Sequence, residues 1–223
     1  MPNLYQTFQA EFAKLLENKN CLYAKKSNTS ANYSGTTKEF LGITVPCLRQ
    51  FAKKFYTKYL KNADQQTKIE LLNQLFTSNI HEYYKVASEL LNKDKKLLYA
   101  IDWDTLFKWL SNAQGWEEVD QFFYITTSAK FIHDMQKTTN FVSKITPELI
   151  KLANTQQPEN KRGALVLLIR PLRKFKDTPE HLPNLKNLAN KLLSLPTYQE
   201  KHPPIVKKAV KWLERVVART HTQ

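Results

Sequence analysis

The stretch "GITVPCLRQFAKKFYTKYL", residues 42–60, shows the residue pattern that decides the fold. Thr44 is a suitable N-cap for a helix, and Pro46 falls in the first turn, where a missing backbone N–H removes no intrahelical bond. Apolar residues then recur at helical spacing, and the basic residues fall off that face. The apolar residues are Leu48, Phe51, Ala52 and Phe55, and the basic ones are Arg49, Lys53 and Lys54. The stretch therefore predicts an amphipathic helix over about residues 45–60.

Helical periodicity recurs along most of the chain. Residues 4–17 repeat apolar positions at helical spacing, whereas "KKSNTSANYSGTTKEF", residues 25–40, has no periodicity and predicts a loop. Further helical segments are predicted at about residues 66–77, 81–92, 103–112, 115–133, 147–154, 160–170, 182–194 and 204–219. Helices of two to four turns do not bury their apolar faces alone, so we expect antiparallel helix pairs that stack on one another.

The composition supports an all-α fold. The chain has 223 residues but only four glycines, which argues against a sheet built from hairpins with tight turns. With 42% hydrophobic residues, the chain is long enough for one sizeable core, so a single domain over residues 1–223 is expected. A solenoid of helix pairs is the favoured architecture, and an ordinary helical bundle is the alternative.

The charge of the chain is strongly positive and unevenly distributed. Lys and Arg number 34 against 20 Asp and Glu, which gives a formal net charge of +14. Such an excess favours polyanions or anionic membrane surfaces as partners. Basic residues dominate residues 21–62, 161–176 and 200–223, whereas acids dominate residues 100–135. We interpret this as an anion-binding face interrupted by a functional acid, and a merely solvated basic surface is the alternative.

Several classes of protein are not supported by the sequence. Cys21 and Cys47 match no C-x-x-C spacing and are not expected to form a disulfide, so a reducing cytoplasmic location is predicted. There is no signal-peptide pattern and no apolar stretch long enough to span a membrane. The histidines lack metal-ligand spacing, and the P-loop, G-x-S-x-G and Rossmann patterns are absent. We therefore expect neither a metal nor a cofactor.

The last predicted helix carries an aromatic residue among cations. Its apolar stripe is complete without Trp212, and Lys208, Arg215 and Arg219 align with that tryptophan on another face. Tryptophan is more often a core residue, but this arrangement favours a surface that meets a negatively charged partner with stackable groups. The apolar stripe consists of Ile205, Val206, Ala209, Val210, Leu213, Val216 and Val217.

A second notable stretch is "QGWEEVDQF", residues 114–122, in the least basic part of the chain. Four-residue spacing on a helix predicts that Trp116 and Asp120 share a face. Asp120 is then either a capping or paired structural acid, or a carboxylate that stabilises a cationic transition state.

Five segments together resemble the AlkD-type DNA alkylation-repair glycosylases, which are built from HEAT-like repeats. They occur in the order of that family and span most of the chain. The segments are "EFLGITVPCLRQFAKKF" at 39–55, "HEYYKVASELL" at 81–91, "WEEVD" at 116–120, "KRGALVLL" at 161–168 and "VKKAVKWLERV" at 206–216. The resemblance implies a superhelix of helix pairs with a concave, basic groove for duplex DNA.

The resemblance also implies a reaction and roles for individual residues. Such enzymes, acting without metal or cofactor, remove N3- and N7-alkylated purines, whose positive charge makes the base a good leaving group, and leave the base unflipped. The catalytic acid of the family falls on Asp120, its tryptophan partners on Trp116 and Trp212, and a groove arginine on Arg162. Arg162 is implied to hold a phosphate near the lesion. A monomer that binds damaged duplex DNA, and no membrane, is expected.

The N-terminal part of the groove departs from the family pattern. Tyr33 occupies the position of a shared tyrosine, but "SGTTKE" replaces most of what usually follows. This departure leaves the N-terminal contacts of the groove open. DNA contacts are expected from Tyr33 at the family position and from Lys208, Arg215 and Arg219 of the last helix. The stretches "QQPEN" and "FKDTPEHLPN" are expected to be insertions in loops.

Three functions remain open from the sequence. The favoured one is a glycosylase for cationic alkylpurines, because an acid and two tryptophans accompany the basic residues. The second is a non-catalytic DNA-binding relative, and the third is a helical-repeat scaffold for protein partners. Steep salt dependence of DNA binding separates the first two from the third.

Overall fold

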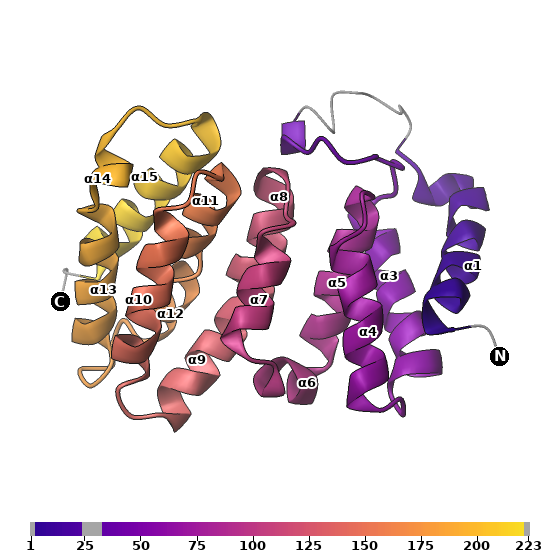
Figure 1. Cartoon of the computed structure of the whole chain (residues 1–223), viewed down its shortest axis with the longest axis horizontal. Coiled ribbons are helices and arrows are strands. Elements are labelled where there is room, and N and C mark those ends of the chain that lie inside the picture. Colours follow the sequence, from indigo (N-terminus) through magenta and orange to yellow (C-terminus); the bar gives the residue numbers. More distant parts are fainter. Residues whose placement is uncertain (1–2, 24–32, 221–223) are drawn as a thin grey trace. The chain divides into compact units, whose positions relative to one another are not determined.

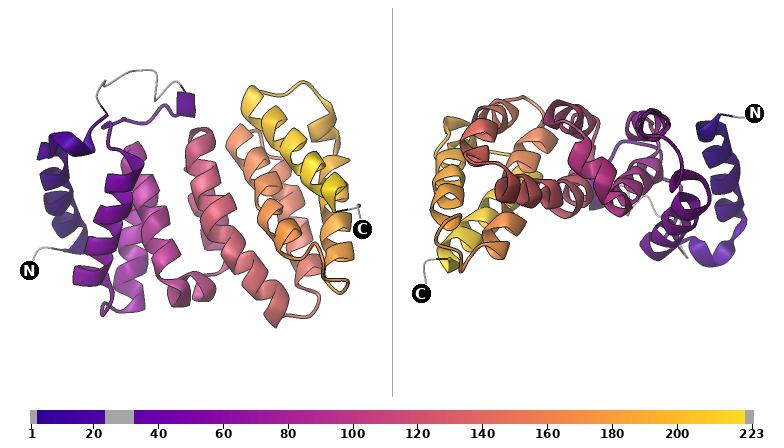
Figure 2. Two further views of the ribbon diagram at one scale, coloured as in Figure 1. Left: turned by 180° about the vertical axis from the view of Figure 1, so that it is seen from behind. Right: turned by 90° about the horizontal axis from the view of Figure 1, so that it is seen from below.

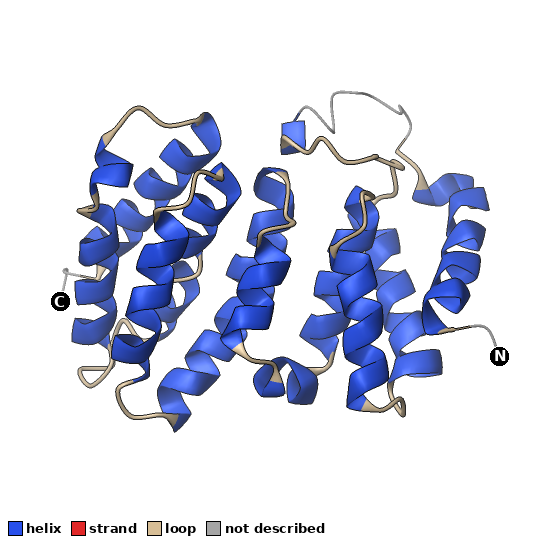
Figure 3. Ribbon diagram, viewed as in Figure 1, coloured by secondary structure: helices blue, strands red, loops and turns tan. Residues whose placement is uncertain are grey.

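The computed structural model describes residues 3–23 and 33–220. In this part of the chain every regular element is helical (Figure 3), and bridge-type pairing is limited to Leu22 with Ile43 and Glu39 with Ile80. The all-α prediction is therefore confirmed. The chain divides into two compact units, residues 1–101 with 112–118 and residues 102–111 with 119–223, which are described separately.

The first unit contains packed antiparallel helices (Figure 1). They are α1 (Leu4–Glu17), η1 (Lys19–Cys21), α3 (Val45–Phe55), η2 (Tyr56–Leu60), α4 (Gln65–Phe76), α5 (His81–Lys93) and α6 (Lys95–Ala100). Helix α5 packs against both α3 and α4. The start of α8 (Gly115–Val119) also belongs to this unit, because the boundary falls after Glu118.

Helix α3 forms where the sequence predicts it. Thr44 is the N-cap residue, with an extended backbone but no hydrogen bond from its side chain, and Pro46 lies in the first turn. The helix continues to Leu60 through η2, a π-helical segment in which the backbone N–H of Lys61 bonds to the carbonyl of Tyr56 at 2.8 Å. The prediction for residues 45–60 is confirmed, although the hydrogen-bond pattern changes within it.

Aromatic side chains form the core of the first unit. Phe8 and Phe12 of α1 meet Tyr83 of α5 edge to face, with ring centroids 5.0 and 4.9 Å apart. Phe51 and Phe55 of α3 complete the cluster, with centroids 5.5 and 5.3 Å from that of Phe8. Each such pair adds about 0.5–1.5 kcal/mol beyond the area that it buries. These contacts explain why the apolar faces of α1 and α3 turn toward α5.

The two cysteines differ from the prediction, because Cys21 and Cys47 form a disulfide. Their Cα atoms lie 5.6 Å apart, within the range that a disulfide requires. The backbone N–H of Thr44 bonds to the carbonyl of Cys21 at 2.8 Å, which brings the end of η1 to the start of α3. This approach of two segments separated by 26 residues could not be read from cysteine spacing.

The second unit is also a set of packed helices. They are α7 (Trp103–Leu110), η3 (Asp120–Thr127), α9 (Ser128–Lys137), α10 (Phe141–Ala153), α11 (Pro158–Val166), α12 (Ile169–Lys174), α13 (Leu182–Leu193), α14 (Pro196–Gln199) and α15 (Pro204–Arg219). Helix α11 lies at the centre, between α10 and α15, and also contacts η3. Helix α15 lies against α11 and α12, as the view from behind shows (Figure 2).

The burial of α11 follows from its sequence. Residues 164–169, "ALVLLI", are all fully buried, as expected for a helix with apolar residues on every side. Gly163 allows the close approach of α7, since a Cβ atom there would lie 2.6 Å from a methyl carbon of Leu110. Arg162, at the polar start of the same helix, is therefore carried into the interior.

Several predicted segments differ in their limits. Helix α10 begins at Phe141 rather than at residue 147, because Pro147 lies inside it rather than in its first turn. The segment 160–170 is divided between α11 and α12 by a turn at residues 167–168. Helices α6 and α14 were not predicted, because they are too short to show periodicity. The predicted loop at 25–40 is confirmed from residue 35 onward, and residues 24–32 lie outside the described residues.

No helix within residues 3–23 and 33–220 is both long enough and apolar enough to cross a membrane.

Glu82, at the start of α5, anchors the chain that leads into α3. Its buried carboxylate accepts hydrogen bonds from three consecutive backbone N–H groups, those of Leu41, Gly42 and Ile43, at 3.0, 2.8 and 3.3 Å. A buried backbone N–H group without an acceptor lowers the stability of the folded state. The Glu82 side chain supplies the acceptors for residues 41–43, which have no regular secondary structure.

We expect Glu82→Ala to lower the free energy of unfolding by about 2–4 kcal/mol, because it strands buried N–H groups. The matched control is Glu70→Ala on the exposed face of α4, which should cost under about 1 kcal/mol. Urea unfolding followed by circular dichroism measures both. Equal effects of the two substitutions would contradict this role of Glu82.

Candidate nucleic-acid interface

In the second unit, Asp120 and Arg162 form a bidentate ion pair. Arg162 donates from Nε to Oδ1 of Asp120 at 2.8 Å and from Nη2 to Oδ2 at 2.7 Å. The arginine side chain is 6% exposed and that of the aspartate is 17% exposed. Two parallel bonds to a carboxylate are the strongest and most directional arrangement that arginine makes. The carboxylate is thus fixed in orientation, and its side chain keeps a small exposed fraction.

The backbone places this carboxylate at the beginning of a rare structure. Asp120 is the first residue of η3, which is π-helical over Asp120–Thr127. Segments of this kind are uncommon and often lie at functional sites, because they change the direction of side chains relative to an α-helix.

The guanidinium of Arg162 also connects two helices. Its Nη1 donates to the backbone carbonyl of Ile205, in the first turn of α15, at 2.7 Å. Arg162 therefore joins the start of α11 to both η3 and α15. This geometry accounts for three of the N–H directions of the fork.

Trp212 of α15 lies beside the pair in an aromatic and cationic cluster. Its ring centroid is 4.9 Å from that of Tyr124, which lies on η3. The guanidinium of Arg173 lies 5.8 Å from the indole ring and donates to the hydroxyl of Tyr124 at 3.1 Å. Trp212 remains partly exposed, so one part of its ring is packed and another can meet a ligand.

A cavity of about 510 Å³ opens on this surface. The residues that line it are Arg162, Lys208, Lys211, Trp212, Glu214 and Arg215. Four cations against one acid make the lining attractive to phosphate, and the indole supplies a face for a sugar or a base. The cavity therefore has the chemistry expected for contact with a nucleic-acid backbone.

In the first unit, Trp116 and Tyr33 form an exposed pair of aromatic residues. The indole N–H of Trp116 donates to the backbone carbonyl of Tyr33 at 2.7 Å, and the two rings meet edge to face with centroids 5.3 Å apart. Tyr33 is 70% exposed and Trp116 is partly exposed. We call Tyr33 and Trp116 the aromatic pair.

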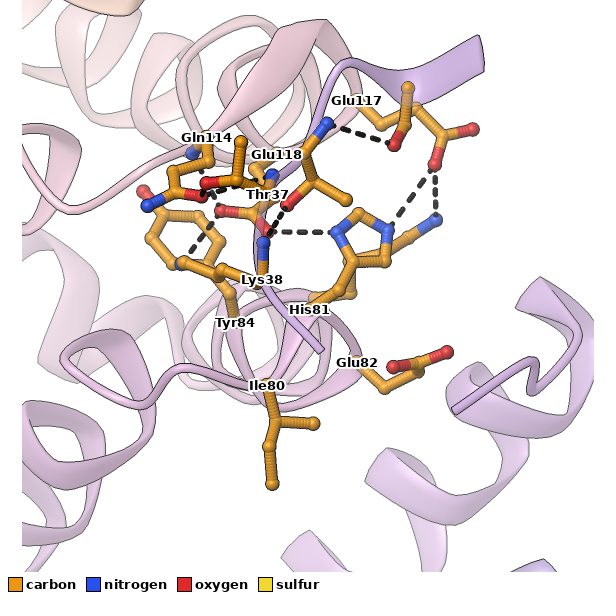
Figure 4. A network of polar contacts seen from close by, with 12 residues as sticks. Thr37, Lys38, Ile80, His81, Glu82, Tyr84, Gln114, Glu117 and Glu118 are labelled. Carbon is orange, nitrogen blue, oxygen red and sulfur yellow. Dashed lines mark hydrogen bonds and ion pairs between the residues drawn. The ribbon is translucent and has the colours of Figure 1, made fainter. Parts of the chain in front are cut away.

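Next to the aromatic pair lies a buried polar network, shown in Figure 4. Glu118 is completely buried. Its Oε2 lies 2.8 Å from Nζ of Lys38, and its Oε1 lies 2.8 Å from Nδ1 of His81. Glu117 extends the network, with distances of 3.4 Å to His81 and 3.2 Å to Lys85. Charges buried to this degree are stable only when each one has partners.

The network shifts the pKa values of its members. Burial opposes the charged form of His81, but its contacts with Glu117 and Glu118 outweigh burial and raise the pKa above the usual value of 6.5. The contact with His81 lowers the pKa of Glu117, against the opposite effect of burial. Burial lowers the pKa of Lys38 despite its contact with Glu118. The network therefore favours a protonated imidazole between two carboxylates.

Residues 13–223 match the sequence model of a family described as DNA alkylation repair enzyme. The chain belongs to this family. No curated protein matches the chain. The family match includes residues of both units, and it agrees with the resemblance that the sequence segments indicated.

The structure of this DNA alkylation repair family member brings together part of the predicted set. Arg162 is bonded to Asp120 in the second unit, and Arg162 lines one cavity together with Trp212, Lys208 and Arg215. Arg219 lies in the last turn of α15 and does not line the cavity. Trp116 and Tyr33 meet each other in the first unit, and the prediction that Trp116 and Asp120 share a helix face stays a prediction.

Three cavity or cluster residues were missed by sequence reasoning. Lys211 lies three residues after Lys208 and four before Arg215, so helical spacing could have identified it. Tyr124 and Arg173 join Trp212 from η3 and α12, and no local sequence signal indicates that meeting. Within residues 3–23 and 33–220, no group of three or more His, Cys, Asp or Glu side chains is placed to hold a metal ion.

We expect Arg162→Ala to destabilise the protein by about 3–5 kcal/mol, because it leaves the Asp120 carboxylate largely buried without its cation. Arg215→Ala, an exposed position on the same cavity, is the control and should cost under about 1 kcal/mol. Thermal and urea unfolding measure both effects. If Arg162→Ala lowers the free energy of unfolding no more than Arg215→Ala does, the ion pair does not contribute to stability.

The stability provided by His81 should depend on pH. Because its folded pKa is raised, the contribution is fully present below the unfolded value near 6.5 and is lost as pH rises through the folded pKa. The difference in unfolding free energy between wild type and His81→Gln should therefore shrink from pH 6 to pH 9. Urea titrations at several pH values measure it, and a constant difference would contradict the assignment.

Proposed function

We propose that this DNA alkylation repair family member is a monofunctional DNA glycosylase for cationic N3- and N7-alkylated purines in duplex DNA. The observation that carries the proposal is the Asp120 carboxylate, held by Arg162, which itself lines the basic cavity beside Trp212. One arginine thus connects an oriented acid to a surface suited to the DNA backbone. The proposal extends to one repair domain over residues 1–223, because the family match includes both units.

The chemistry requires little of the protein beyond electrostatics and position. As the N-glycosidic bond breaks, the bonding electrons go to the alkylated base, which leaves as a neutral molecule, and positive charge develops at C1′ of the deoxyribose. The Asp120 carboxylate stabilises that charge, and a water molecule adds to C1′ and loses a proton to give an abasic site. No metal or redox step is involved in this scheme.

The other residues would bind and orient the DNA. Lys208, Lys211 and Arg215 would engage phosphates, and Trp212 would press against the sugar-phosphate backbone. Trp116, Tyr33 and Arg219 would contribute further backbone contacts, as the resemblance implies. The main role of Arg162 in this scheme is to hold Asp120, because its guanidinium is bonded to that carboxylate and to the carbonyl of Ile205. A phosphate contact from the same guanidinium, and a concave groove for the duplex, stay predictions.

A second candidate function is DNA binding without catalysis. One observation favours it, because the bidentate contact with Arg162 is also the arrangement of an ordinary structural ion pair. In that case the cavity would recognise the backbone of distorted DNA, and Asp120 would serve only to hold Arg162 and α15.

Release of free methylated base from methylated duplex DNA decides between the two functions. Asp120→Asn keeps the shape of the side chain and one oxygen acceptor for Arg162, so the rate is compared at a temperature at which circular dichroism shows both proteins folded. Under that condition it should reduce the rate of release about 10²–10³-fold, the usual effect of losing one preorganised electrostatic group, with DNA affinity nearly unchanged. Asp177→Asn, an exposed acid of the same unit, is the control and should release base as wild type does.

Two results would overturn the glycosylase proposal in different ways. No release by wild type, together with DNA binding that weakens steeply with salt, would favour the non-catalytic function. Absence of salt-sensitive DNA binding would instead favour a scaffold for protein partners.

A further inference from the structure

The loop that carries Tyr33 lies directly against the start of α8. Gly115 has a φ of +75°, and a Cβ atom there would lie 2.1 Å from the carbonyl oxygen of Ser34. Only glycine allows the two backbones to come this close. Thr37 adds to the contact, because its backbone N–H and its hydroxyl both donate to the side-chain oxygen of Gln114. Residues 34–37 are therefore packed directly against residues 114–115.

A buried ion pair between Lys38 and Glu118 also joins these two segments. Lys38 follows the loop, and its Nζ lies 2.8 Å from Oε2 of Glu118, with side chains that are 3% and 0% exposed. The same oxygen accepts the backbone N–H of Gln114 at 2.9 Å, at the start of α8. Glu118 thus bonds to the loop through Lys38 and to its own helix start through Gln114, as Figure 4 shows.

Lys38 is not placed for chemistry of its own. A lysine with a lowered pKa is a candidate amine nucleophile. The Nζ of Lys38, however, lies in the interior, bonded to Glu118 and 4.3 Å from the centre of the Tyr84 ring. A substrate on the surface does not reach it, so its contribution has to act through other residues.

Stability alone is also a weak reason for such a pair. Desolvation of two buried charges largely cancels their attraction, and apolar replacements are often neutral. What a buried ion pair does provide is one preferred register, because a displaced loop would leave a charge unpaired. The element whose register depends on this pair is the loop that carries Tyr33.

We propose that the ion pair between Lys38 and Glu118 is a positioning device that holds the aromatic pair in place for contact with the DNA backbone. Neither Lys38 nor Glu118 touches DNA in this scheme. The contact of the aromatic pair with DNA rests on the proposed function, whereas the positioning of the aromatic pair does not.

Hydrogen exchange of the Trp116 indole N–H tests the positioning directly, because this proton is bonded to the carbonyl of Tyr33. Lys38→Met keeps the aliphatic stem and removes the charge, and it should speed this exchange about tenfold or more, the effect of losing one charged hydrogen bond. Lys85→Met is the matched control, since it removes a cation from the same network at a residue outside the loop. The control should change the rate less than about twofold, because its partner Glu117 is partly exposed and keeps its contact with His81.

Two further measurements separate positioning from general stability and from DNA binding. Exchange of the Leu75 backbone amide in the core of the first unit reports the loss of overall stability in each variant, and the Trp116 indole N–H of Lys38→Met should exchange faster than this loss explains. The dissociation constant for duplex DNA should rise about tenfold for Lys38→Met only, and this rise should disappear when Trp116 is already replaced by Ala.

Each outcome decides the inference. Equal indole exchange in wild type and Lys38→Met, or an equal change in Lys85→Met, would overturn the positioning role. Fast exchange in Lys38→Met with no DNA binding by any variant would support the positioning role and contradict the proposed function instead.

Discussion

A charged group that is buried in the protein interior needs hydrogen-bonding partners of opposite charge or polarity there. This requirement sets the geometry of the candidate site. Residues 164–166 at the end of α11 and residues 167–169 after it are apolar and fully buried, so α11 is buried and takes the guanidinium of Arg162 with it. That group needs several acceptors at fixed angles, and Asp120 and the carbonyl of Ile205 supply them. The orientation of the carboxylate and the position of α15 both follow. The basic cavity around Trp212 exists because α15 is held at this point.

The same requirement appears in the first unit with the signs reversed. Glu118 is the buried charge, and Lys38, His81 and the N–H of Gln114 surround it. Here the partners come from a loop, from α5 and from the start of α8. In both units a single ion is satisfied by elements that are distant in sequence. Each candidate contact surface for DNA lies next to such an ion, which explains how exposed aromatic residues keep a defined geometry.

Much of the fold could be predicted, because helical periodicity is a local property. The limits of α1 and α15 agree with the predicted segments, and the surface position of Trp212 followed from an apolar stripe that was complete without it. The errors lie where tertiary contacts override local signals. Pro147 is accommodated inside α10, and the disulfide depends on an approach of two segments that spacing does not show. Tyr124 and Arg173 were missed for the same reason.

The helical class, the positive charge and the candidate acid and tryptophans could be predicted from the sequence, because each depends on residue type and on spacing within one helix. Only the tertiary structure decided the partners of these residues. Asp120 meets Arg162 across 42 residues and Lys38 meets Glu118 across 80, separations at which no periodic pattern carries information. The physical reason is that the partner of a buried charge depends on which side chains lie beside it once the helices have packed together.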